Sequence, residues 1–427
     1  MSATPQDDAH EALVARFRDN RLSKEAPRSS AEVSAAFDQI AYPLLQRSGV
    51  SCRLIELYSA SKRCVSTRVD GSDYIVFDHA LLNCFERFDA LDDPKLPPSL
   101  VAAGLHLAIA EASRNAQRVD FYSFYLRRAL EVEPLLRRLP GKPDAAFRRY
   151  WLAAFVLCHE AAHALPENSE TKLNLAQSAL LASSSLLDEQ IAALSGSLDA
   201  LLSDSATPPS PRNAPGVEME QWLAAADDLG LGEDAIYDVL EEVATDSRFL
   251  DEIACDSFAV SGLELALESM RKTASEEAVA RVAVNALSAA YLGFLHYRLV
   301  GYFEDIVSGV DDYLAAEKVN PLKLRLLVEM SLRGNLVVQR MIELARSFGG
   351  NGTANALRDA FASLQHEHTS RLFVPGDQLI ATTVLDDRFR EKLRSMLAED
   401  KINLESLDLD PLDVCAESDL LWQQLND

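Results

Sequence analysis

One stretch limits what this chain can fold into more than any other: residues 151–167, with the sequence WLAAFVLCHEAAHALPE. Its first half is apolar and Pro166 follows, so it predicts a buried helix over about residues 144–165. Inside it, His159 and His163 are four positions apart. Four residues make about one helical turn, so the two imidazoles project from the same face. The stretch therefore predicts a helix with two nitrogen ligands placed for a single Zn²⁺.

Glu160 follows the first histidine directly and completes the pattern H-E-x-x-H. It projects about 100° round the helix from His159, near the metal without aiming at it. A carboxylate in that place can accept a proton from a zinc-bound water, which is the general-base role of this motif. The alternative is a helix whose two histidines only form hydrogen bonds in the core.

A catalytic zinc site needs a third protein ligand and an open fourth position. Residues 249–260, FLDEIACDSFAV, read as a second half-apolar helix. Glu252 and Asp256 are four positions apart there and share a face. The alternative is that both carboxylates belong to a solvated acidic face.

The HEAAH segment and the later Glu252-x-x-x-Asp256 pair together resemble the signature of the gluzincin metallopeptidases. In looser pattern they are similar to CaaX-type proteases and their soluble relatives. This resemblance implies one zinc per chain, with Glu252 as the third ligand. It also implies that Asp256 accepts the distal N–H of a ligand histidine and fixes its tautomer. Five other residues stay open as the third ligand: Glu241, Glu242, Asp246, Asp251 and Cys255.

Strand signals are concentrated in residues 52–78. Partial alternation, β-branched residues and Asp70-Gly71 predict a hairpin. The resemblance implies a small antiparallel sheet before the metal helix, whose edge strand, residues 74–77, would pair with a bound peptide. The alternative is a sheet that only covers the helix.

The rest of the chain reads as helical, which predicts an α+β fold that is predominantly α. We expect an N-terminal helical segment (1–50), a zincin-like core (51–270) with a Pro/Ser-rich linker near 203–216, and a helical C-terminal region (271–427). Further helices are predicted at these places: 8–19, 30–47, 80–89, 98–117, 119–137, 169–203, 217–229, 232–245, 275–317 and 385–399.

The net charge and the composition of the chain limit the classes of binding partner that it can have. The net charge of −25 argues against nucleic acid and against an anionic membrane surface. The N-terminus shows no secretory signal, and no apolar run approaches 18 residues. The six cysteines follow no disulfide-like spacing. We therefore expect a cytoplasmic protein with a protein or peptide substrate and no membrane partner.

Four further histidines, Tyr297 and Arg325 lie outside the proposed ligand set. His106 lies in an apolar run and is expected in the core. Arg325, after Asn320-Pro321, is expected in a salt bridge or in contact with substrate. His366 and His368 point to opposite sides of a helix, which argues against a second metal site. A donor to the oxyanion is left open among four residues: His296, Tyr297, His366 and His368.

The sequence holds no phosphate-binding P-loop, no dinucleotide fingerprint and no G-x-S-x-G elbow. It predicts an intracellular zinc endopeptidase. The alternative is a catalytically silent zincin-fold protein that binds partners or acts as a sensor and keeps zinc for structure.

Overall fold

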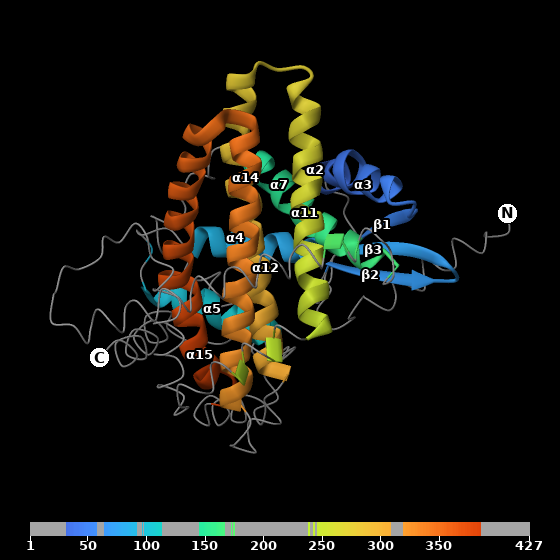
Figure 1. The fold of residues 1–427 in the computed structure, drawn as a ribbon. Coiled ribbons are helices and arrows are strands. Elements are labelled where there is room, and N and C mark those ends of the chain that lie inside the picture. The colour runs from blue at the N-terminus through green and yellow to red at the C-terminus, as the bar shows by residue number, and fades with distance from the viewer. Residues whose placement is uncertain are drawn as a thin grey trace.

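The structure is a computed structural model of the 427-residue chain. It describes residues 31–57, 64–91, 96, 98–112, 145–166, 172, 174–175, 238–239, 242–243, 246–308 and 319–385. Within them the protein is mostly helical with one small sheet, which confirms an α+β fold that is predominantly α (Figure 1). The helices predicted at 8–19, 119–137 and 217–229, the linker near 203–216 and the candidate ligand Glu241 lie outside the described residues, as does the helix predicted at 385–399 except for Leu385. So does most of the helices expected at 169–203 and 232–245.

Three strands form the sheet: β1 (Cys52–Leu57), β2 (Cys64–Val69) and β3 (Ser72–Asp78). The β2–β3 pair is antiparallel, and Asp70 and Gly71 join the two strands with φ angles of 49° and 77°. Two positive φ angles in a two-residue loop are what a type I′ hairpin requires, so the predicted hairpin is confirmed.

The third strand corrects two expectations. β1 pairs with β3 in parallel, with Ile55 opposite Val76, so the sheet is mixed rather than antiparallel. The strand order β1-β3-β2 places β3 in the centre. Because both edges of β3 are already paired, residues 74–77 have no free edge for a bound peptide. Alternation within a strand marks its two faces but not the direction of its partner, and for that reason the sequence did not reveal this order.

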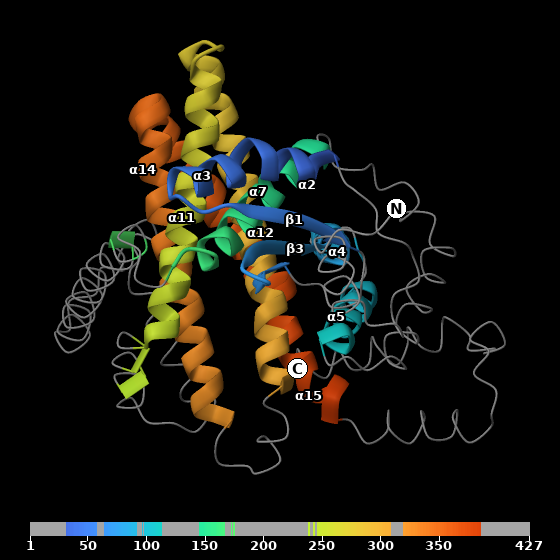
Figure 2. The ribbon, with the colours of Figure 1, turned by 90° about the vertical axis from the view of Figure 1, so that its right-hand side faces the viewer.

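Helix α7 (Ala145–His163) lies at the centre of the fold, close to the range predicted for it. Its residues from Trp151 to Ala162 are buried. It packs against α11 (Ser247–Arg271), α12 (Glu276–Ser308), α2 (Ala31–Ala36) and the strands β2 and β3. Figure 1 shows the sheet on one side of α7 and the long helices α12 and α14 on the other, and Figure 2 shows the same arrangement from the side of the sheet.

The long helices carry the C-terminal part of the same core. Helix α14 (Val319–His368) packs along α12 and α11, and its geometry is broken at Gly349-Gly350, where Gly350 has a φ of 68°. One cluster of buried apolar residues extends from Val33 in α2 to Phe361 in α14. The helices that bear the ligands are therefore packed into one core with α12 and α14.

A second apolar cluster lies beside α12 and joins it to four further elements. They are α4 (His79–Leu91), α5 (Pro98–Ala112), η3 (Thr369–Phe373) and α15 (Val374–Leu385). His106 is buried in α5, as expected of a core histidine. Before the sheet, η1 (Phe37–Ala41) and α3 (Tyr42–Arg47) continue α2.

In the described part of the chain, one helical segment is long and apolar enough to cross a membrane by length and composition alone. It covers Glu276–Val307 of α12, and 56% of its most apolar window is buried inside the protein. The central helix of a globular core passes the same test.

Candidate metal centre

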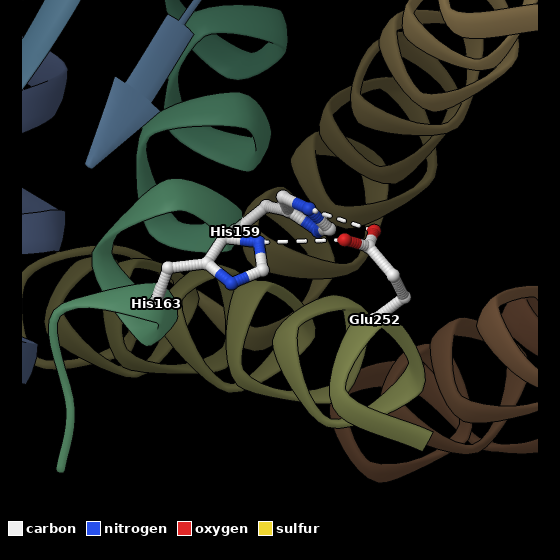
Figure 3. A group of neighbouring side chains, drawn as sticks. All are labelled: His159, His163 and Glu252. Atoms are coloured by element: carbon white, nitrogen blue, oxygen red, sulfur yellow. Dashed lines mark ion pairs between the residues drawn. The ribbon is translucent and has the colours of Figure 1, made fainter. Parts of the chain in front are cut away.

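The helices α7 and α11 bring three of the predicted metal ligands together (Figure 3). His159 Nε2 lies 3.4 Å from Glu252 Oε2, and His163 Nε2 lies 3.6 Å from Glu252 Oε1. With metal–ligand bonds of about 2.0–2.1 Å, two ligand atoms of a tetrahedral zinc site lie roughly 3.3–3.5 Å apart. The observed separations are close to this spacing, so the three side chains fit a single small cation.

Carboxylates hold the other nitrogen of each imidazole. His159 Nδ1 lies 2.8 Å from Asp256 Oδ1, and His163 Nδ1 lies 3.2 Å from Asp251 Oδ2. When Nδ1–H donates to a carboxylate in a neutral imidazole, the lone pair on Nε2 is available for a metal ion. Histidines that bind metals usually have this arrangement. The structure thus places Asp256 where the resemblance put it and adds Asp251 in the same relation to His163.

Asp251 and Cys255 were candidate ligands, and with His163 they form a second possible metal group. Lys172 Nζ lies 2.6 Å from Asp251 Oδ1, so this carboxylate is already in an ion pair. Burial, with Asp251 and Glu252 nearby, raises the pKa of Cys255 far above its usual range, so the sulfur stays a thiol unless a metal ion displaces its proton. The group with Glu252 is therefore the better metal site.

The remaining candidate ligands that the structure describes, Asp246 and Glu242, make other contacts. Asp246 caps α11 by accepting a hydrogen bond of 2.7 Å from the backbone N–H of Arg248. Arg325 pairs with Asp246, Glu242 and Glu329. Arg325 is thus a salt-bridge residue, the structural role that the sequence allowed for it.

Arg333, from α14, is the residue of this site that the sequence reading missed. It donates to both oxygens of Asp256, from Nε to Oδ2 at 2.7 Å and from Nη2 to Oδ1 at 2.9 Å. Its Nη1 lies 2.8 Å from Glu252 Oε2. Its one signal in the sequence is a charged residue among the apolar positions of a long helix. The buried guanidinium of Arg333 therefore binds both Glu252, the candidate third ligand, and Asp256, the carboxylate next to His159.

These contacts set the charges of the site. Burial opposes the charged form of His159, but its contacts with Asp256 and Glu252 outweigh this and raise the pKa of His159 to about 10. Nε2 therefore carries a proton at neutral pH unless a metal ion binds there and displaces it. Burial also opposes ionisation of Glu252 and Asp256, yet the Arg333 guanidinium and His159 hold both pKa values below their usual range. Both carboxylates are therefore anionic at neutral pH, and Glu252 can act as a ligand.

Glu160 lies beside the metal group and is buried. Its Oε1 accepts a hydrogen bond of 2.5 Å from the Tyr297 hydroxyl, and its Oε2 accepts one of 3.2 Å from the backbone N–H of Ser66 in β2. Burial and the neighbouring Glu160 raise the pKa of Tyr297 well above its usual value. Tyr297 therefore stays protonated and remains a hydrogen-bond donor.

The structure also separates the four candidates for the oxyanion donor. Tyr297 packs edge-on to His159, with ring centroids 5.8 Å apart. His296 instead lies against His368, at 5.5 Å, and Phe88, while His366 is exposed. Tyr297 is thus the candidate that lies at the metal group.

A cavity of about 1020 Å³ lies next to the metal group. Glu160, Glu252, Tyr297 and Arg333 line it, together with Cys64 and Val65 of strand β2. The general-base candidate and the third ligand therefore face a space large enough for a peptide segment.

Fold and site together define a mostly helical α+β protein with a buried group of two histidines and a glutamate that could hold a metal ion. Comparison with family models, with curated proteins and with solved structures finds no match to this chain.

Proposed function

We propose that this protein is a zinc-dependent peptidase of the cytoplasm that hydrolyses bonds in proteins or peptides. The observation that carries the proposal is the convergence of His159 Nε2, His163 Nε2 and the Glu252 carboxylate beside Glu160. Two imidazoles and one carboxylate are the ligand set of many catalytic zinc sites. The resemblance to the gluzincin metallopeptidases, with a zincin-like core, is part of this proposal.

Bound zinc would polarise a scissile carbonyl and make a water molecule more acidic. The protein's own side chains would then move the protons. Glu160 would accept a proton from the attacking water and deliver it to the leaving amine. Its hydrogen bonds from Tyr297 and Ser66 hold its carboxylate towards the cavity.

Tyr297 has a second role in this proposal. Its ring packs against His159 and its hydroxyl stays protonated. The single O–H donates to Glu160 in this structure, and it would turn to the carbonyl oxygen as negative charge develops there and Glu160 takes up the proton of the water. Asp256 and Asp251 keep the two imidazoles oriented throughout.

The test compares the wild type with Glu160→Gln. Purified wild type should contain about one zinc per chain by elemental analysis. Glu160→Gln should keep that zinc and lose turnover, because an amide cannot accept the proton. Proteomes of cells that express either protein are then compared for new protein termini, with Glu268→Gln on the exposed face of α11 as the matched control. New termini that appear equally with Glu160→Gln would overturn the mechanism.

A second candidate is a catalytically silent protein that keeps zinc for structure. One observation favours it: both oxygens of Glu160 already accept hydrogen bonds inside the protein. Each carboxylate oxygen has two lone pairs, so these bonds still leave room for a water. A full zinc content with no new termini from the wild type would favour the silent protein.

A further inference from the structure

Arg298, on α12, is half-buried and differs from two other arginines that line the cavity, Arg325 and Arg333. Its neighbour in sequence is Tyr297, and both side chains line the cavity. Arg298 Nη1 is buried and has no hydrogen-bond partner among the described residues. Arg325 and Arg333 line the same cavity, and carboxylates pair with both. Arg298 is therefore a cation within the site that forms no ion pair with a carboxylate of the described residues, although the charges of Asp256, Glu252 and Glu329 act on it from farther away.

The position of Arg298 is fixed although no carboxylate holds it. Its guanidinium carbon lies 5.7 Å from the centre of the buried Phe294 ring, which is within the range of a cation–π contact. Burial, and then the nearby Arg333 guanidinium, lower its pKa to about 9, so it is still cationic at neutral pH. The buried Nη1 of Arg298 has no acceptor among the described residues, which is unfavourable, and a ligand that supplies an anion removes this cost.

We propose that Arg298 binds a carboxylate of the substrate beside the metal group, so that the preferred substrates carry a negative charge near the scissile bond. This inference rests on the proposed function for its choice of a peptide as substrate. Two sources supply the same chemistry: an aspartate or glutamate side chain, or the free carboxyl end of a peptide. A guanidinium recognises both through paired, parallel hydrogen bonds.

The rest of the cavity favours a single negative charge over a more highly charged anion. Glu304, Asp305 and Glu329 also line it. Burial and the neighbouring Glu304 and Glu329 raise the pKa of Asp305 to about 6, which reflects the density of negative charge there. A phosphate would meet more repulsion from this side than a carboxylate would.

The experiment uses two pools of random octapeptides. One pool is amidated at the C-terminus and contains aspartate and glutamate; the other contains neither residue and holds each sequence both with a free and with an amidated C-terminus. The full-length zinc-loaded Glu160→Gln protein, which does not turn over, captures peptides from each pool, and mass spectrometry identifies them. The same capture is repeated with Arg298→Gln and with Arg248→Gln, each added to Glu160→Gln. Arg248 is an exposed arginine that lines the same cavity, so it controls for the loss of one positive charge.

We expect enrichment of acidic peptides from the first pool, of free-acid peptides over their amidated equivalents from the second, or of both. Arg298→Gln should lower this preference by roughly 10- to 100-fold, the range for a charge-assisted hydrogen bond, while Arg248→Gln preserves it. Capture without a carboxylate preference, no capture at all, or a preference that survives Arg298→Gln would each overturn the proposal.

Wild-type protein is incubated with the same pools to separate the two proposals. Cleavage without a carboxylate preference would leave the peptidase standing and remove the role of Arg298. Selective capture without any cleavage would leave the carboxylate site standing and remove the peptidase.

Discussion

Replacing Asp256 by asparagine tests the electrostatic design of the metal centre most directly. The change is isosteric, so the side chain still fits, but it removes the charge that faces His159 on one side and Arg333 on the other. The asparagine oxygen can still accept a hydrogen bond from His159 Nδ1. The variant therefore tests the effect of the negative charge of Asp256 while it keeps the shape of the side chain and its hydrogen bond to His159.

Two effects follow, and the structure sets the size of each. The Asp256 side chain is 4% exposed and that of Arg333 is 10% exposed, so water cannot replace the lost partner. Breaking a buried ion pair from one side costs about 3–5 kcal/mol of folding free energy. Loss of a carboxylate behind a ligand histidine lowers metal affinity about 10- to 100-fold, which is about 1.4–2.7 kcal/mol of binding free energy.

The matched control is Asp251→Asn, the same chemical change behind the other histidine. The Asp251 side chain is 35% exposed, so water can take over its hydrogen bond to His163. The change also removes the ion pair with Lys172, whose side chain is only 8% exposed, so this control destabilises the fold as well. The comparison between the two variants therefore rests on zinc affinity, and we expect Asp251→Asn to lose less of it than Asp256→Asn loses.

Competition titration against a chelator measures zinc affinity, and urea denaturation with and without zinc measures stability. An Asp256→Asn protein that binds zinc as tightly as the wild type would refute the role assigned to this carboxylate. Equal losses of zinc affinity in the two variants would show that the burial of the carboxylate does not set the size of this effect.

Three further changes probe the ligand, the donor and the helix packing. His163→Ala should lose zinc from the purified protein, as seen by elemental analysis, and a full zinc content would remove His163 as a ligand. Tyr297→Phe should keep its zinc and lower kcat on a cleaved substrate by roughly 10²-fold, because one donor to the developing charge is lost; an unchanged kcat would exclude that role. A Cβ added at Gly262 of α11 would lie 2.6 Å from Cys158 Sγ of α7. Gly262→Val should therefore lower folding stability by about 1–3 kcal/mol in thermal or urea unfolding, and an unaltered midpoint would show that the two helices separate easily.

Local sequence signals were sufficient for the parts of the fold whose determinants are close in sequence. The Asp70-Gly71 turn and the apolar run before His159 each depend on a few neighbouring residues, and the structure has the expected hairpin and helix there. The spacing of Glu252 and Asp256 predicted one shared helical face, and both side chains point towards His159. Periodicity alone predicts such features.

Contacts between distant segments were not predictable in the same way. Arg333 is 77 positions from Asp256, and nothing in its neighbourhood marks it as part of the site. The choice of Tyr297 over His296 depends on how α12 is rotated against α7, which residue spacing does not fix. The parallel pairing of β1 with β3 depends on long-range packing, so the predicted antiparallel sheet was wrong.

The position of Arg333 has a consequence for the order in which the protein matures. On the ribosome, α7 and α11 emerge before α14, so both imidazoles, Glu252 and Asp256 are synthesised before the guanidinium that balances their acidic members. Until α14 docks, Glu252 and Asp256 would have to share the interior as like charges. The ligand set would then take up its final geometry, and bind a metal ion, only after α14 has been synthesised and has docked.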